Sequence, residues 1–299
     1  MSEFLRVPDV LGEVSAVLGG NTVESERILL ASLERDLGMQ VGRARMYLEF
    51  REHLSPETRD RALGIARERA RGASLQYLLG VQDFLDHEYE VNPNVLIPRP
   101  ETEILVREVL RTYKDRRPEG GLRGAEIGLG SGVISIELLA NRPDLRMTAT
   151  EVCAEARSLA LRNVDRVLGD RDRLEILAPD SASDVVKTLS WYLEAGLGPL
   201  DFLVSNPPYL SPEEAEAEVV RNEPHGALFP AGGDLLLFYR EIAANAGGFL
   251  RPDGLVFLEI PHERADEIQA LFTREGWDAW IQSDLTLRDR VLVAKRVQQ

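Results

Sequence analysis

Cysteine and histidine are scarce in this chain. Cys153 is the single cysteine among 299 residues, so the chain can form no internal disulfide and no cysteine-rich zinc site. The four histidines are scattered, without the short spacings that are typical of metal ligands. We therefore expect no metal cofactor.

An excess of basic residues and a long apolar run are also missing. Lys and Arg total 35 against 50 Asp and Glu, and the net charge of −15 argues against a dedicated duplex-DNA binder. No apolar segment approaches the roughly 18 residues that span a bilayer, and Glu3, Arg6 and Asp9 interrupt any secretory signal core. We expect a soluble, cytoplasmic monomer that binds neither nucleic acid nor membrane.

What is present is typical of a folded protein with more than one domain. Hydrophobic residues make up 44% and charged residues 28% of the chain, close to the globular average. A length of 299 residues favours two domains over one. Residues 1–80 carry 11 basic and 12 acidic side chains, so most of the negative charge lies in the remainder. This asymmetry indicates two modules with different roles.

Residues 1–75 are predicted to form a small helical domain. One helix has Asn21 and Thr22 as candidates for its N-cap, and its apolar stripe consists of Val23, Ile28, Leu29, Leu30 and Leu33. Another is expected from Pro56 to about Arg71, with Ser55 as its N-cap. The segment has 11 arginines and no lysine, and we interpret it as a domain that docks the substrate or a partner.

Residues 76–98 are predicted to link this domain to the rest of the chain as a β-hairpin. Phe84–Val91 alternates bulky and polar residues, and Asn92-Pro93-Asn94 is a turn signal before Val95–Ile97.

Residues 99–299 are predicted to form an α/β domain, because strands and helices alternate along them. The expected strands are Leu122–Ile127, Arg146–Glu151, Leu174–Leu177, Asp201–Ser205, Gly254–Ile260, Trp277–Ile281 and Arg290–Lys295. The expected helices are Glu101–Tyr113, a helix ending at Ala140, Ala154–Val167 and Ala265–Glu275. Such a succession requires a doubly wound, mostly parallel sheet of Rossmann-like type. Ligands bind these sheets at the C-terminal ends of the strands.

A glycine loop, Glu-Ile-Gly-Leu-Gly-Ser-Gly over residues 126–132, lies at a predicted strand-to-helix turn. Gly128, Gly130 and Gly132 let the backbone pass close to a ligand. Valine stands where the dinucleotide pattern G-x-G-x-x-G ends in glycine, which favours a nucleoside without a pyrophosphate. Glu151, which ends the next strand, can accept hydrogen bonds from both ribose hydroxyls. A mere tight turn and a solvated strand-end glutamate are the competing interpretations.

A second candidate loop, Ser205-Asn206-Pro207-Pro208-Tyr209, follows another predicted strand. Two consecutive prolines stiffen the backbone and supply no N–H, which leaves carbonyl oxygens free. The side-chain oxygen of Asn206 and the carbonyl of Pro207 can each accept one N–H of a planar –NH2 group, while Tyr209 packs its ring against that group. The competing interpretation is a Pro-Pro loop that only ends a strand.

These residues carry a resemblance to a known family. Asn206–Tyr209 resembles the hallmark of methyltransferases that act on amide or exocyclic amino nitrogens. Further segments are similar to the bacterial protein-(glutamine-N5) methyltransferases, in the branch that modifies peptide chain release factors. These segments are Gly-Ala-Ser-Leu-Gln-Tyr-Leu-Leu-Gly (72–80), Val-Leu-Ile-Pro-Arg-Pro-Glu-Thr-Glu (95–103), Glu-Pro-His-Gly-Ala-Leu (223–228) and Phe238-Tyr239. The resemblance covers nearly the whole chain.

The resemblance implies a class I methyltransferase domain over residues 99–299 that uses S-adenosyl-L-methionine and releases S-adenosyl-L-homocysteine. The implied substrate is the glutamine of a Gly-Gly-Gln loop in a release factor. It implies catalytic roles for Asn206, Pro207 and Tyr209, and substrate contacts from Asn206, Pro207, Pro208, Tyr209 and Arg99. The implied cofactor-binding residues are Gly128, Leu129, Gly130, Ser131, Gly132, Glu151, Asp180, Ser181 and Asn206.

The chain departs from the family pattern in a few places. Glu126 and Glu151 stand where Asp is usual, Leu129 where a small polar residue is usual, and Ser181 where an aromatic residue often follows Asp180. Residues 182–199 form a longer connection than is usual, and an added helix is predicted there from Val185, Val186, Leu189 and Leu193.

Other functions are compatible with parts of this pattern. An adenine-N6 nucleic-acid methyltransferase also uses Asn-Pro-Pro-Tyr, but we expect a basic surface in such a protein. A ribosomal-protein glutamine methyltransferase and a non-catalytic cofactor-binding scaffold are further alternatives. We interpret His225 as a surface or structural residue rather than a base, and the run Glu213, Glu214, Glu216 and Glu218 as a solvated helix face that can also steer a basic partner.

Overall fold

The computed structural model describes residues 5–180 and 199–297, and it divides into two compact units, Met1–Gly80 and Val81–Gln299. The sequence placed the domain boundary at residue 75 and a linker over 76–98. The division instead falls after Gly80, a left-handed glycine with a φ of 80° that ends helix α5 (Leu75–Leu79). Ser181 and the helix expected within 182–199 lie outside the described residues.

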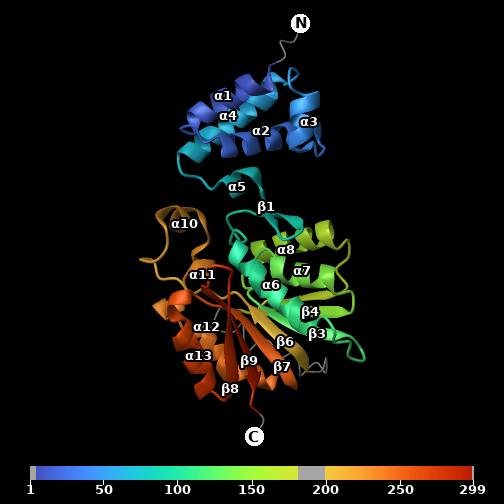
Figure 1. Ribbon diagram of the computed structural model, residues 1–299, viewed down its shortest axis with the longest axis vertical. Helices are drawn as coiled ribbons and strands as arrows, with labels where there is room; N and C mark the ends of the chain where they lie inside the picture. The colour runs from blue at the N-terminus through green and yellow to red at the C-terminus, as the bar shows by residue number, and fades with distance from the viewer. Residues whose placement is uncertain (1–4, 181–198, 298–299) are drawn as a thin grey trace. The chain divides into compact units, whose positions relative to one another are not determined.

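The smaller unit is helical, as predicted, and is built from α1 (Val7–Val17), α2 (Thr22–Leu37), α3 (Gly42–Glu49), α4 (Pro56–Ala70) and α5 (Figure 1). Both predicted caps are confirmed. The Asn21 side chain accepts the backbone N–H of Glu24 at 3.1 Å, and Ser55 accepts that of Thr58 at 3.1 Å. These bonds satisfy amide groups that the first turn of a helix leaves unpaired.

The apolar stripe of α2 is buried in part. Ile28, Leu29 and Leu33 belong to the core of the unit, but Val23 is 77% exposed. Val23 lies five positions before Ile28, which at about 100° per residue turns it roughly 140° away from that face. The prediction that Val23 shares the buried stripe is therefore wrong.

The predicted hairpin exists with a different turn. Its strands are β1 (Val81–Phe84) and β2 (His87–Glu90), joined at Leu85 and Asp86 rather than at residues 92–94. Leu85 adopts a left-handed φ of 50°, and its backbone N–H donates to the Glu103 carboxylate at 3.2 Å. Leucine is not a residue that marks turns, so this tertiary bond had no local signal in the sequence.

The hairpin packs within the larger unit. The Tyr89 hydroxyl donates to the buried Glu137 carboxylate of α7 (Val133–Asn141) at 2.8 Å. The backbone N–H of Glu90 donates to the Asn163 side chain of α8 (Ala154–Val167) at 2.7 Å. Residues 95–97, which were predicted as the second strand, are not in a strand, because the N–H of Ile97 bonds to a side chain instead of to a neighbouring strand.

The larger unit contains a seven-stranded sheet in the order β5-β4-β3-β6-β7-β9-β8 (Figure 1). Its strands are β3 (Leu122–Ile127), β4 (Leu145–Thr150), β5 (Leu174–Leu177), β6 (Leu200–Ser205), β7 (Leu250–Glu259), β8 (Trp277–Ser283) and β9 (Asp289–Arg296). Strands β3 to β7 pair in parallel, and β9 is antiparallel to both of its neighbours. The predicted doubly wound, mostly parallel sheet is confirmed.

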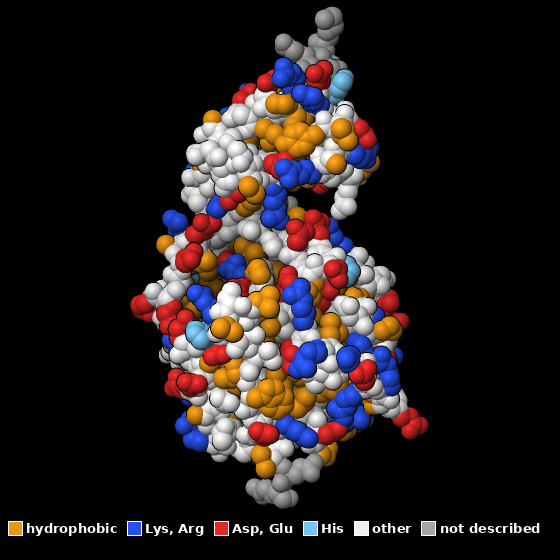
Figure 2. Space-filling model, viewed as in Figure 1, with side chains coloured by type: hydrophobic (Ala, Val, Ile, Leu, Met, Phe, Trp, Pro, Cys, Tyr) orange, Lys and Arg blue, Asp and Glu red, His pale blue; other side chains and the backbone are white. Residues whose placement is uncertain are grey.

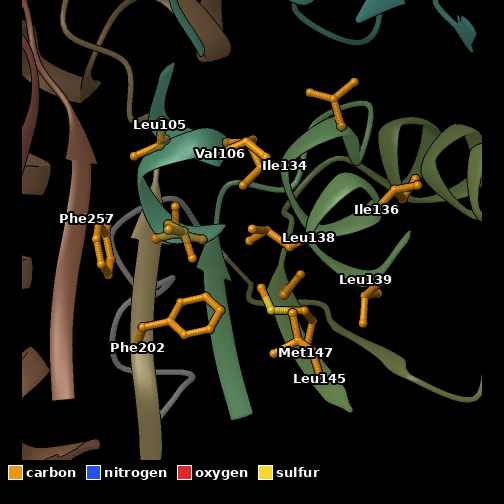
Figure 3. Packing of buried hydrophobic residues seen from close by; sticks show 14 of the residues in the cluster. Leu105, Val106, Ile134, Ile136, Leu138, Leu139, Leu145, Met147, Phe202 and Phe257 are labelled. Atoms are coloured by element: carbon orange, nitrogen blue, oxygen red, sulfur yellow. The ribbon is translucent and has the colours of Figure 1, made fainter. Parts of the chain in front are cut away.

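Helices cover both faces of this sheet. Helices α6 (Pro100–Tyr113), α7 and α8 pack on one face, and α12 (Leu237–Asn245) and α13 (Ala265–Arg274) pack on the other (Figure 1). On the first face Leu105 of α6 and Leu138 of α7 lie over Met147, Phe202 and Phe257 of the strands (Figure 3). Burial of this apolar surface fixes the strands, so that the carboxyl ends of β3, β4, β6 and β7 meet at one edge.

In the part of the chain that the structure describes, no helix combines the length and the apolar character needed to cross a membrane.

Candidate active site

The glycine loop at residues 128–132 joins β3 to α7, as predicted. Gly130 and Gly132 have positive φ angles of 56° and 87°. The positive φ favours glycine at position 132, where a Cβ would also lie 2.9 Å from the end of the Ile136 side chain. The side chain of Asn163 donates to the carbonyl of Ser131 at 2.9 Å and ties the loop to α8.

Glu151 follows β4 and braces the same loop. One carboxylate oxygen accepts the backbone N–H of Gly130 at 2.8 Å, and the other accepts that of Cys153 at 2.9 Å. The side chain is 9% exposed and lines a cavity. Each oxygen has a second lone pair, so the carboxylate can still accept hydrogen bonds from a ligand.

We define the first cavity as the hollow of about 390 Å³ above the carboxyl ends of β3, β4 and β6. Of the predicted cofactor-binding residues, Gly128, Leu129, Gly130, Ser131, Glu151 and Asn206 line it. Gly132 does not line the cavity, and its left-handed backbone conformation shapes the loop instead. Asp180, three residues after the end of β5, is exposed and is not among the residues that line the cavity.

A buried carboxyl group forms part of this cavity. Glu126, at 1% exposed, accepts the backbone N–H of Ser135 at 3.0 Å and also the hydroxyl of Ser135. Burial raises the pKa of the Glu126 carboxyl to about 8 despite these hydrogen bonds.

The Asn-Pro-Pro-Tyr loop follows β6. The Asn206 side chain donates through Nδ2 to the Thr102 hydroxyl at 3.1 Å, and the Tyr209 hydroxyl donates to the Glu259 carboxylate at 3.3 Å. Burial raises the pKa of the Tyr209 phenol, so it stays a proton donor.

A second cavity of about 400 Å³ also borders this loop. Asn206, Pro207 and Pro208 line both cavities, whereas Tyr209 lines only the second. The charged residues of the second cavity are Arg99, Glu101, Glu214, Glu216, Glu259 and Arg290. Residues 206–208 are therefore a wall that two cavities share.

The acidic run near this cavity is not a helix face. Helix α10 (Ala217–Asn222) begins only after Glu216, so Glu218 alone of the four glutamates lies on a helix, and its side chain is half-buried there. The Glu214 carboxylate pairs with Arg264 and accepts the N–H of Ser211 at 2.9 Å, which holds the segment as a turn instead.

Arg99 lines both cavities, and a buried carboxylate fixes its position. Its guanidinium pairs with Glu223, a residue 5% exposed, whose carboxylate also accepts the backbone N–H of Ile97 at 3.1 Å. The two segments that carried the family resemblance at residues 95–103 and 223–228 are thus joined by one buried carboxylate.

Thr102 and Glu259 were missed in the sequence, although both line the cavities. The Thr102 hydroxyl donates to the Glu259 carboxylate at 2.7 Å, and burial raises the pKa of Glu259 to about 7. Glu259 is the last residue of β7. An acidic residue at the end of a parallel strand is the same signal that singled out Glu151.

His225 and Cys153 differ in their relation to the two cavities. His225 is exposed, packs edge-on against Phe229 with 5.5 Å between ring centroids, and lines neither cavity. Cys153 lines the first cavity. Over residues 5–180 and 199–297, no group of three or more His, Cys, Asp or Glu is arranged to hold a metal ion.

Comparison with known proteins gives close relatives of the whole chain. No protein-family model matches it. It is 34% identical over 300 residues to the release factor glutamine methyltransferase of Moorella thermoacetica, covering 99% of this chain and 100% of that protein. It is 33% identical over 274 residues to that of Geobacter sulfurreducens, covering 90% and 88%.

Among solved structures, the hMettl16 catalytic domain in complex with the MAT2A 3'UTR hairpin 6 superposes with a TM-score of 0.52. The match covers 79% of this chain and 83% of that one at 16% identity, and it supports the α/β fold alone.

Proposed function

The chain belongs to the release factor glutamine methyltransferase family, and from this premise we propose its reaction: transfer of a methyl group from S-adenosylmethionine to the side-chain amide nitrogen of a glutamine in a peptide chain release factor. The glutamine of a Gly-Gly-Gln loop is the proposed acceptor. One observation carries the proposal: residues 206–208 form a wall between two cavities, so that a donor and an acceptor can meet there.

We place S-adenosylmethionine in the first cavity, where it supplies a methyl group activated by its sulfonium charge. The residues present suit a nucleoside with a ribose. Glu151 presents a buried carboxylate that is held by two backbone N–H groups and still has lone pairs for ribose hydroxyls. Gly128 and Gly130 keep the loop beside it free of side chains.

We place the acceptor carboxamide in the second cavity, against the same wall. An amide nitrogen is a poor nucleophile because its lone pair is delocalised into the carbonyl. The Asn206 side-chain oxygen and the Pro207 carbonyl each accept one N–H and so hold the –NH2 group in a single orientation. Alignment of this kind can remove on the order of 7–11 kcal/mol from a barrier. The same two oxygens stabilise the positive charge that develops on nitrogen, and water takes the proton afterwards.

Three further residues shape the acceptor side in this proposal. Pro207 and Pro208 fix the backbone of the wall. Tyr209 packs against the flat acceptor group while its hydroxyl is held by Glu259. Arg99, fixed by Glu223, lies at the edge of both cavities and can donate a hydrogen bond to a backbone carbonyl or carboxamide oxygen of the substrate.

We assign partner docking to the smaller unit. Several of its arginines form ion pairs with carboxylates. The distance from Nη2 of Arg59 to Oε2 of Glu13 is 2.6 Å, and the distance from Nη2 of Arg61 to Oδ1 of Asp36 is also 2.6 Å. Figure 2 shows Lys and Arg intermixed with Asp and Glu on this face of the chain. Such a surface suits a protein partner that presents charges of both signs better than it suits a polyanion.

The test is methyl transfer with labelled S-adenosylmethionine and a purified release factor, followed by peptide mass spectrometry. We expect one methyl group on the glutamine of the Gly-Gly-Gln loop, and none when Asn206→Ala replaces the wild type. Methyl incorporation into duplex DNA or into a ribosomal protein, with an unmodified release factor, would contradict the proposal.

A further inference from the structure

The proposed reaction requires that Asn206 presents its oxygen, and not its nitrogen, to the acceptor. The two ends of a carboxamide have almost the same size and shape, but one accepts hydrogen bonds and the other donates them. With the nitrogen turned toward the acceptor, two –NH2 groups would face each other and neither could accept. A neighbouring group must therefore select the orientation.

A buried chain of hydrogen bonds lies behind Asn206. Nδ2 of Asn206 donates to Oγ1 of Thr102 at 3.1 Å, and Oγ1 of Thr102 donates to Oε2 of Glu259 at 2.7 Å. Thr102 is 3% exposed and Glu259 is 2% exposed. The three residues come from the first turn of α6, the end of β7 and the loop after β6.

The chemistry of this chain fixes its direction. A threonine hydroxyl has one proton, and here Glu259 takes it. Only lone pairs remain on Oγ1 to face Asn206, so the carboxamide can pair with Thr102 only through its –NH2 group. The second oxygen of Glu259 accepts from Tyr209 at 3.3 Å, so both oxygens of this carboxylate act as acceptors.

We propose that Thr102 and Glu259 are positioning residues that hold Asn206 with Oδ1 toward the acceptor carboxamide. This inference rests on the proposed function, because it assigns a role to the wall that the donor and the acceptor share. Neither residue needs to touch the reacting atoms.

The ionised form of Glu259 is the form that maintains this direction. A protonated Glu259 can donate to Thr102, which frees the threonine proton to bond Oδ1 of Asn206 and reverses the carboxamide. The titratable and charged groups that face Glu259 are Tyr209, Tyr239, Glu101 and Arg290. Because burial raises the pKa of Glu259 to about 7, turnover should fall as the pH drops through that value.

The first experiment compares Thr102→Val, which keeps the shape and loses the hydroxyl, with Thr102→Ser, which keeps the hydroxyl. For Thr102→Val we expect kcat to fall about 10- to 100-fold, with KM for the release factor within about threefold, because only the orientation at the reacting nitrogen changes. Thr102→Ser should stay within about threefold of the wild type. Thr148→Val, at a buried threonine of β4 outside both cavities, is the matched control and should leave kcat unchanged.

A Thr102→Val enzyme whose kcat stays within about threefold of the wild type would overturn the proposal. Glu259→Gln gives a second kinetic readout, because it should remove the loss of turnover below pH 7. Retention of that loss in Glu259→Gln would assign it to another group and count against the role of Glu259.

The second experiment does not depend on activity. The side-chain ¹⁵NH₂ signals of Asn206, assigned from their absence in Asn206→Ala, report proton exchange at Nδ2. One proton should exchange slowly in the wild type and in Thr102→Ser, and fast in Thr102→Val. If the wild type does not methylate a release factor, the proposed function fails, and this readout alone decides the orientation. Fast exchange of both Nδ2 protons in the wild type would overturn the proposed orientation of Asn206.

Discussion

The two cavities that border residues 206–208 have nearly the same volume, about 390 and 400 Å³, but different chemistry. The first is bounded by the glycine loop and by apolar side chains, and its two carboxyl groups, Glu126 and Glu151, both accept backbone N–H groups. The second is bounded by four carboxylates and two guanidinium groups. The backbone groups and the shape of the first cavity suit a small ligand of fixed structure. The charged side chains of the second cavity suit a larger partner that must be attracted and oriented.

The comparison also shows how each cavity treats a buried acid. Glu126 in the first cavity is bonded to the start of α7, and its carboxyl has a pKa of about 8. Glu259 in the second is bonded to Thr102 and Tyr209, with a pKa of about 7. Burial raises both pKa values because it disfavours the charged carboxylate. The hydrogen bonds to each carboxyl group offset this effect only in part.

Removal of the shared wall residue should have the largest effect. Asn206→Ala is expected to lower kcat by about 10³-fold or more, because the acceptor nitrogen loses its alignment. The dissociation constant for S-adenosylmethionine, measured by calorimetry, should stay within about threefold. Equal losses in turnover and in donor binding would contradict the division of roles between the cavities.

Glu151→Ala should affect the first cavity alone. Glu151→Ala loses two charge-assisted bonds to ribose hydroxyls, each worth about 1.5–3 kcal/mol, so the dissociation constant for S-adenosylmethionine should rise by at least about 100-fold. Turnover at saturating donor should change little, and Glu151→Asp, which keeps both acceptor oxygens, is the matched control. A larger effect on KM for the release factor than on donor binding would show that Glu151 serves the acceptor instead.

The two buried acids should make stability depend on pH. Their folded-state pKa values of about 8 and about 7 lie above the ordinary value of 4.5, so the folded chain binds more protons than the unfolded chain between these limits. The free energy of unfolding should therefore fall as the pH rises from 5 to 7, with each acid contributing up to about 1.4 kcal/mol per pH unit.

Chemical denaturation across this pH range is the measurement. Glu126→Gln and Glu259→Gln should each flatten the dependence, one for each cavity. A wild-type stability that rises between pH 5 and pH 7, or two variants that keep the wild-type slope, would contradict the assignment.

The smallest expected effect concerns the rim of the second cavity. Glu101→Gln combined with Glu216→Gln should raise KM for the release factor about two- to fivefold at low ionic strength, because exposed rim charges act mainly on encounter. Donor affinity should not change, and added salt should remove the difference between variant and wild type. A variant whose KM matches the wild type at low salt would count against electrostatic steering.

Most of the larger unit could be predicted from local patterns. The bounds of β3, α8 and β5 agree with the prediction, because apolar period and turn residues mark them within a few positions. The lining of the first cavity could also be predicted from the sequence, because the glycine loop and Glu151 lie within one short stretch of chain.

What the sequence did not reveal depends on distant contacts. The turn at Leu85 is stabilised by Glu103, 18 residues away, and the bond between Thr102 and Glu259 joins positions 157 residues apart. Their meeting follows from the sheet order, which places β7 beside β6, and from the packing of α6 at the same edge. No periodicity within either segment carries that information.

A crystal structure with S-adenosylhomocysteine and a peptide containing Gly-Gly-Gln tests the central claim most directly. We predict that the ribose hydroxyls lie on the carboxylate of Glu151 in the first cavity. The glutamine side chain should reach the other face of the wall, with its nitrogen within hydrogen-bond distance of the Asn206 side-chain oxygen and the Pro207 carbonyl. A nucleoside bound in the second cavity, or a glutamine held away from Asn206, would contradict the account.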